Sequence, residues 1–127
     1  MFITIDETDR RPIYQQVVDE IKALIATGEL PQGSSLPPVR QVAADLGVNL
    51  NTIAVAYREL KKVGLIKIRH GSGAVVIAQG LPQANEERLQ AKLMPALTDL
   101  ILSGLTRAEV MAIVNNALNT LFRQNLR

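Results

Sequence analysis

The sequence predicts a mainly α-helical protein with a small β wing: a winged helix-turn-helix domain followed by a two-helix tail. Three segments with apolar residues at helical spacing come first. Two short β-rich runs around a glycine-bearing tip follow them, as in a hairpin. A segment with Gly and Pro then precedes a purely helical remainder. At 127 residues the chain can form one ordinary domain with a small appendage, but not a large effector-binding domain in addition.

The N-terminal part predicts a short strand or extended arm and then a helix. The arm is the stretch FITID, in which apolar and polar residues alternate. Pro12 is placed as a first helical residue, and apolar residues then recur at helical spacing until Gly28. We therefore expect a helix over residues 12–27, followed by a turn segment, GELPQGSSLP.

The next two helices are predicted to cross as a helix-turn-helix. The first covers about residues 38–46, and the second runs from residue 49 or 50 to about residue 63. Helices that cross through a short turn need a small residue where they touch, a glycine at the turn and an inward branched side chain. Ala43, Gly47 and Ile53 meet these three requirements.

The wing is predicted from the runs LIKI and AVVIA, which flank RHGSG. A hairpin there has a donor-rich tip, narrow enough to lie along a minor groove or a phosphate backbone. The residues of that tip are Arg69, His70, Gly71 and Ser72. We expect the winged-helix domain to cover residues 1–78, a linker residues 79–84, and the tail residues 85–127.

The tail is predicted to hold two amphipathic helices. Pro95 interrupts the leucine stripe of the first, so we expect a kink or a broken start there, whereas Thr106 and Glu109 make a capping box for the second. Two helices this short cannot bury both stripes on each other, which predicts a homodimer, with folding back onto the winged helix as the alternative. The predicted dimer interface consists of Leu89, Leu93, Leu97, Leu100, Val110, Ile113, Val114, Ala117, Leu118, Leu121 and Phe122.

The first turn of the helix that begins near residue 49 is the predicted base-reading tip. Its side chains, short enough to let the backbone approach a major groove, are those of Asn49, Leu50, Asn51 and Thr52. An asparagine offers a donor and an acceptor together, which matches an adenine edge, while Leu50 or the Thr52 methyl matches a thymine methyl. Asn49 can alternatively cap the helix, and the two roles are compatible.

Cations gather around this tip, although the net charge of the chain is only +2. Residues 40–78 include six cations and two anions. Arg40 is expected to grip a phosphate or reach a guanine, with an ion pair to Asp45 or Glu59 as the alternative. Phosphate contacts are also expected for Arg58 and Lys61, and a solvated helix face is the alternative for this cluster.

Composition argues against several other classes. There is no cysteine and one histidine, so we expect no disulfide, no metal site and no cofactor. No apolar run approaches the roughly 20 residues of a membrane span, and the start of the chain does not resemble a signal peptide, so we expect a cytoplasmic protein. No nucleophile–base pair or paired carboxylate site can be assembled, which argues against an enzyme.

The stretch from Pro12 to Val76, PIYQQVVDEIKALIATGELPQGSSLPPVRQVAADLGVNLNTIAVAYRELKKVGLIKIRHGSGAVV, resembles the winged-helix domain of GntR-family transcriptional regulators. The resemblance implies a dimeric, operator-binding repressor. Better-known members have arginines where this chain has Leu50 and Ala54, so their base contacts do not transfer and its operator should differ. By position, the implied DNA contacts are Arg40, Asn49, Asn51, Thr52, His70 and Gly71.

The short tail is similar to that of the YtrA-type subfamily, which the resemblance links to dimerisation and to control of transporter operons. The function predicted is therefore a sequence-specific DNA-binding regulator that places one recognition helix in each half-site of an inverted repeat in double-stranded DNA. A protein-interaction module whose basic stripe meets an acidic partner is the alternative. A small-molecule effector between the tail helices is left open, because no convergent polar residues in the tail identify its site.

Overall fold

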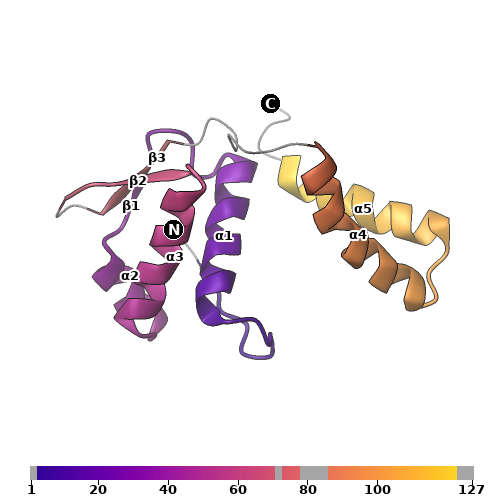
Figure 1. Ribbon diagram of the computed structural model, residues 1–127, viewed down its shortest axis with the longest axis horizontal. Coiled ribbons are helices and arrows are strands. Elements are labelled where there is room, and N and C mark those ends of the chain that lie inside the picture. The colour runs from indigo at the N-terminus through magenta and orange to yellow at the C-terminus, as the bar shows by residue number, and fades with distance from the viewer. Residues whose placement is uncertain (1–2, 71–72, 78–85, 123–127) are drawn as a thin grey trace. The chain divides into compact units, whose positions relative to one another are not determined.

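The computed structural model describes residues 3–70, 73–77 and 86–122 and divides the chain into two compact units, Met1–Pro82 and Gln83–Arg127. The first unit contains three helices and a small sheet, and the second contains two helices (Figure 1). The mainly helical fold with a small wing, predicted from periodicity, is confirmed. The expected linker, residues 79–84, and the wing-tip residues Gly71 and Ser72 lie outside the described residues.

Helix α1 (Ile13–Thr27) lies against α3 and contributes one buried face to the core (Figure 1). It ends at Gly28, whose φ of 88° is the left-handed conformation that glycine adopts without strain. Pro12 is the N-cap, with an extended ψ of 148°, and is not the first helical residue as expected. The expected arm carries no strand at residues 3–5, and Ile3 and Ile5 instead pack against the core.

Helices α2 (Val39–Leu46) and α3 (Leu50–Lys62) form the helix-turn-helix. Gly47 ends α2 with a φ of 68°, and its N–H donates to the carbonyls of Ala43 and Ala44. The three residues between the helices leave room only for a tight bend, so the buried faces of α2 and α3 meet around Ala43 and Ile53. The predicted crossing is confirmed.

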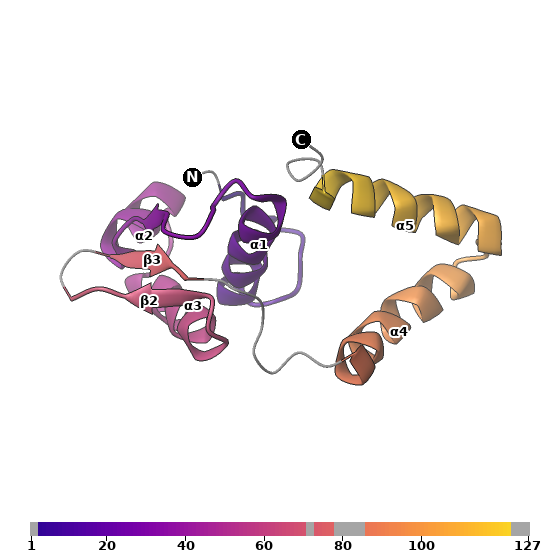
Figure 2. The ribbon, with the colours of Figure 1, turned by 90° about the horizontal axis from the view of Figure 1, so that it is seen from above.

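The wing is a three-stranded antiparallel sheet of order β1-β3-β2. Strands β2 (Ile66–Ile68) and β3 (Ala74–Val76) are the predicted hairpin. Strand β1 (Ser35–Leu36) was not predicted, because its two residues stand inside a turn-rich sequence and show no alternation. It pairs with β3, Leu36 opposite Ala74, and ties the segment before α2 to the wing. Figure 2 shows β2 and β3 beside each other, with β2 next to α3.

One apolar core holds the first unit together, with α3 at its centre. Four side chains of α3 are almost fully buried, and burial of a large one such as Ile53 or Leu60 stabilises the fold by about 1.5–3 kcal/mol. These side chains are Ile53, Ala56, Tyr57 and Leu60. They meet buried residues of α1, α2, β1, β2 and β3, so every element of the unit is fixed relative to α3.

The second unit is a helical hairpin of α4 (Glu86–Leu102) and α5 (Arg107–Phe122). Helix α4 continues through Pro95, so the predicted broken start is wrong: the proline removes a single backbone donor from a 17-residue helix. The capping box of α5 is confirmed, with the Glu109 N–H 3.2 Å from the Thr106 hydroxyl and the Thr106 N–H 3.0 Å from a Glu109 carboxylate oxygen. Hydrogen bonding of the carboxylate to the Thr106 backbone N–H, and then to the Thr106 side chain, lowers the pKa of the Glu109 carboxyl below its usual value.

Two glycines with positive φ are expected to differ in their tolerance of alanine. A Cβ at Gly47 would meet nothing within 4 Å, whereas a Cβ at Gly73 would lie 2.5 Å from the Leu36 carbonyl oxygen. Gly47→Ala should lower the free energy of unfolding by about 1–2 kcal/mol through backbone strain alone. Gly73→Ala should cost more, because the backbone at Gly73 and the segment Leu36–Pro38 must also move apart. Urea denaturation followed by circular dichroism would measure both, and equal losses would contradict the close contact.

Candidate nucleic-acid interface

The first turn of α3 is open to solvent at the tip of the helix-turn-helix. Asn49 is the N-cap, with its Oδ1 2.8 Å from the Asn51 backbone nitrogen that donates to it. The cap occupies one of the two lone pairs of the side-chain oxygen and holds that oxygen toward the helix end. Asn49 is therefore better placed to donate from its NH₂ group, to a phosphate or to an acceptor on a base edge, than to pair fully with adenine.

The other tip residues differ in exposure. Leu50 keeps 44% of its surface exposed, and Asn51 is also exposed. Thr52 is half-buried, so it presents only part of its side chain. The tip therefore offers one apolar side chain beside two amides, a combination suited to a thymine methyl next to polar base edges.

Exposed cations lie on α2 and further along α3, where Lys61 is in the last turn. Arg40 lies in the first turn of α2 and forms no ion pair with Asp45 or Glu59 in the described structure, where all three side chains are exposed. Arg58 and Lys61 are exposed on α3, on the side away from its buried face. The cations are thus available to an anionic partner.

The wing adds cations on a rigid hairpin. The Arg69 N–H donates to the Gly73 carbonyl at 2.8 Å and so closes the ladder just before the tip, while the Arg69 side chain is exposed. His70 is exposed beside it. Lys67 is exposed on β2, which extends the cationic surface along the wing.

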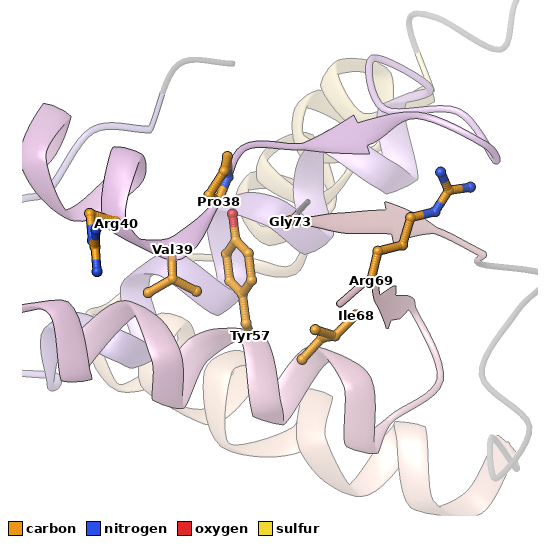
Figure 3. Close-up of a pocket in the computed structure, with 7 residues that line it drawn as sticks. All are labelled: Pro38, Val39, Arg40, Tyr57, Ile68, Arg69 and Gly73. Atoms are coloured by element: carbon orange, nitrogen blue, oxygen red, sulfur yellow. The ribbon is translucent and has the colours of Figure 1, made fainter. Parts of the chain in front are cut away.

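A cavity of about 390 Å³ lies between the start of α2, the middle of α3 and the wing. Figure 3 shows the Tyr57 ring between Val39 and Ile68, with Arg40 and Arg69 at opposite ends of the group. The floor is therefore apolar, and its ends are cationic. Sequence reasoning missed this cavity, because its lining residues are dispersed along the chain and show no local pattern: Pro38, Val39, Arg40, Tyr57, Ile68, Arg69 and Gly73.

The second unit exposes an apolar surface of a different kind. Of the predicted interface residues, Leu97, Leu100, Val110 and Val114 are half-buried in the hairpin. The exposed members are Leu89, Leu93, Ile113, Ala117, Leu118, Leu121 and Phe122. Sequence reasoning missed further exposed apolar side chains at Met94, Ile101, Leu102 and Met111, which lie off the leucine stripe but carry the same signal of large apolar residues on a short helix.

Among the described residues no group of three or more His, Asp or Glu side chains is placed to hold a metal ion. Within the same ranges, no helix has the length and apolar character to cross a membrane. A helix-turn-helix with an exposed tip, flanking cations and a wing instead defines a winged-helix protein of the nucleic-acid-binding class.

Comparison with known proteins agrees with this class. The family described as bacterial regulatory proteins, gntR family, matches residues 13–76, which covers the whole helix-turn-helix and wing. The chain belongs to the gntR family of bacterial regulatory proteins, as its resemblance indicated. It is 36% identical over 74 residues to the HTH-type transcriptional repressor YtrA of Bacillus subtilis, a match that spans 58% of this chain and 57% of that protein. This similarity supports the YtrA-type subfamily.

Solved structures are similar over different shares of the chain. A transcriptional antiterminator from Listeria monocytogenes EGD-e is 29% identical, with a TM-score of 0.82, and the match covers 95% of this chain and 92% of that one. The AraR DBD in complex with operator ORE1 is 26% identical, with a TM-score of 0.50, and the match covers 60% of this chain and 93% of that one. The fold of the first unit thus occurs in a protein bound to operator DNA.

Proposed function

We propose that the protein is a transcriptional repressor that binds an inverted-repeat operator in double-stranded DNA as a homodimer and acts in the cytoplasm without catalysis. The observation that carries this proposal is the solvent-open first turn of α3, accompanied by exposed cations at the start of α2 and on the wing. The repressor name of the Bacillus subtilis relative and the operator complex of the AraR DBD support it.

In the proposed docking mode, the α3 tip contacts DNA bases and the cations contact phosphates. The first turn of α3 enters the major groove, where Asn51 reads a base edge and Leu50 packs on a thymine methyl. Arg40 at the start of α2, together with Lys61 and the wing, meets the phosphate backbone. The cations thus provide attraction that does not depend on sequence, and the α3 tip provides the preference for an operator.

The dimer is carried by the tail. Exposed apolar side chains on both α4 and α5, such as Leu93 at 51% and Phe122 at 53% exposure, leave a hairpin that has not buried its apolar surface. A second copy of the same hairpin is a partner of matching character, and a two-fold axis between copies repeats the recognition helix for two half-sites. A small molecule that binds in this tail could alter the spacing of the two copies.

Substitutions that affect base readout and those that affect phosphate attraction should change DNA affinity in different ways. Asn51→Ala should relax base preference, with a loss of about 1–3 kcal/mol on the operator and little change on random DNA. Lys61→Ala should weaken binding to all sequences alike and make the slope of log K against log salt shallower by about 1. Fluorescence anisotropy across a salt series measures both quantities. If neither substitution changed operator binding, the assigned docking face would be wrong.

The two roles of Asn49 can be tested apart. Asn49→Ser keeps an N-cap acceptor but removes the amide donors, and Asn49→Asp keeps the cap while adding a negative charge. Both variants should unfold within about 0.5 kcal/mol of the wild type, because serine, aspartate and asparagine cap helices about equally well. Operator affinity should fall in both, more steeply for aspartate because its charge faces phosphates. Wild-type affinity in Asn49→Ser would show that the residue is only a cap.

If the tail forms the dimer, one charged substitution on its exposed apolar surface should convert the dimer into a monomer. Leu93→Glu and Leu118→Glu place a carboxylate on the exposed apolar surface of α4 and α5, whereas the matched control Gln90→Glu places one at an exposed polar position. Analytical ultracentrifugation should find monomers for the leucine variants and dimers for the control. Operator affinity should fall by about 100-fold or more for the monomers, since the second half-site is then no longer bound within one molecule. Dimers in all three variants would contradict the proposed interface.

A further inference from the structure

The segment Leu36–Pro38 links β1 to α2 and is held from two sides by elements that are far away in the sequence. From one side, α3 reaches it through Tyr57. From the other, the wing reaches it through Gly73, just before β3, and through the β1–β3 pairing. We refer to Leu36–Pro38 as the junction, because it is where α2, α3 and the wing meet.

The contact from α3 is a single directed hydrogen bond. The Tyr57 hydroxyl donates to the Pro37 carbonyl at 2.6 Å, although the two residues are 20 positions apart in the sequence. The Tyr57 ring is 2% exposed, and Figure 3 shows it rising from α3 with its hydroxyl toward the segment of Pro38. Burial raises the pKa of the Tyr57 hydroxyl to about 12, so it keeps the donated proton at neutral pH.

The contact from the wing is steric. Gly73 has a φ of +81°, and a Cβ there would lie 2.5 Å from the Leu36 carbonyl oxygen and 3.2 Å from the Pro38 nitrogen. The backbones of the junction and the wing are therefore in direct contact, with no side chain between them. Because Leu36 also pairs with Ala74, the junction cannot slide along β3 without breaking the sheet.

The start of α2 depends on this junction for its position. Pro38 is the N-cap of α2 and supplies no side-chain cap, and the helix is only eight residues long. Arg40 lies in its first turn, two residues after the junction. A small rotation at Pro37 would thus be passed directly to Arg40, while the first turn of α3 would stay where the core holds it.

We propose that Tyr57 is a positioning residue for DNA binding: its hydroxyl, bonded to the Pro37 carbonyl, fixes the junction and so sets Arg40 relative to the recognition tip of α3. The inference rests on the proposed function. Tyr57 itself is buried and touches no DNA in this arrangement. Tyr57 raises affinity by ordering the start of α2 in the free protein, so that binding does not carry the entropic cost of this ordering.

The test is a double-mutant cycle on the full chain with Tyr57→Phe and Arg40→Ala. The probe is the tightest-binding duplex that the wild-type protein selects from a random pool, and binding is measured well below the thermal midpoints found by circular dichroism. Phenylalanine keeps the ring and its packing but leaves the Pro37 carbonyl without its donor. Tyr57→Phe should weaken binding to the selected duplex by roughly 5- to 10-fold, the equivalent of one net hydrogen bond.

In the Arg40→Ala background the same change should weaken binding less than about 2-fold, because there is no longer a guanidinium to position. The matched control is Tyr14→Phe, which removes the hydroxyl of the other tyrosine of the chain, on α1, and should leave affinity unchanged. A merely structural role would lower the melting midpoint but leave binding of the folded protein intact, so the cycle separates the two roles.

The possible results of the cycle distinguish the positioning role of Tyr57 from the proposed DNA-binding function. An equal loss in both backgrounds, or no loss at all in Tyr57→Phe, overturns the positioning role while leaving DNA binding in place. If the wild-type protein selects no duplex, the proposed function fails first and the inference falls with it. A loss confined to the background that retains Arg40 supports the proposal.

Discussion

The buried face of α3 is the constraint on which the rest of the winged helix depends. Ile53, Ala56 and Leu60 have no exposed surface, and together with Tyr57 they meet side chains from every other element of the first unit. Because interiors are closely packed, α3 cannot rotate about its axis without opening cavities on several sides at once. The orientation of its exposed first turn is therefore determined by the core, which has no contact with DNA in the proposed mode.

The proposed interface combines two kinds of side chain: uncharged ones at the fixed tip of α3 and charged ones elsewhere on the unit. The α3 tip is short, begins at a capped end and carries little charge, so it can discriminate only at close range. The cations lie elsewhere, on α2, along α3 and on the wing, and attraction to phosphates needs less exact geometry. Asn49 belongs to both parts: its oxygen completes the helix end, and its amide donors face outward. In the proposed mode, the same residue contributes to stability and to the interface.

The two units differ in how many large apolar side chains they expose, and this difference supports a role of the tail in dimerisation. The first unit has buried its apolar residues in one core, with few large apolar side chains left outside. The second, a hairpin of 17 and 16 residues, leaves many of its own exposed. A hairpin of that size gains too little burial by itself to offset the entropy of folding, so in our proposal dimerisation completes its core as well as pairing the recognition helices. Folding of the tail and binding to two half-sites are then coupled.

The sequence by itself determined the helices of the first unit, the glycines that end α1 and α2, the crossing of α2 and α3 and the capping box of α5, but neither the first residue of α1 nor the continuity of α4 through Pro95. These features arise from neighbouring residues: apolar spacing decides a buried face, and a glycine such as Gly28 or Gly47 ends a helix by its own conformational freedom. The tip residues Asn49 and Leu50 could be identified in the same way, because they occupy the first turn of a helix whose start was evident.

Only the tertiary structure decided the parts that join distant segments. Strand β1 exists because β3 lies beside Leu36, and the cavity and the bond from Tyr57 to Pro37 exist because α3 and the junction meet. Likewise, the availability of Arg40 depends on where Asp45 and Glu59 point after folding. None of these contacts has a local signal, since each depends on the closure of a long loop and on packing that the whole core selects.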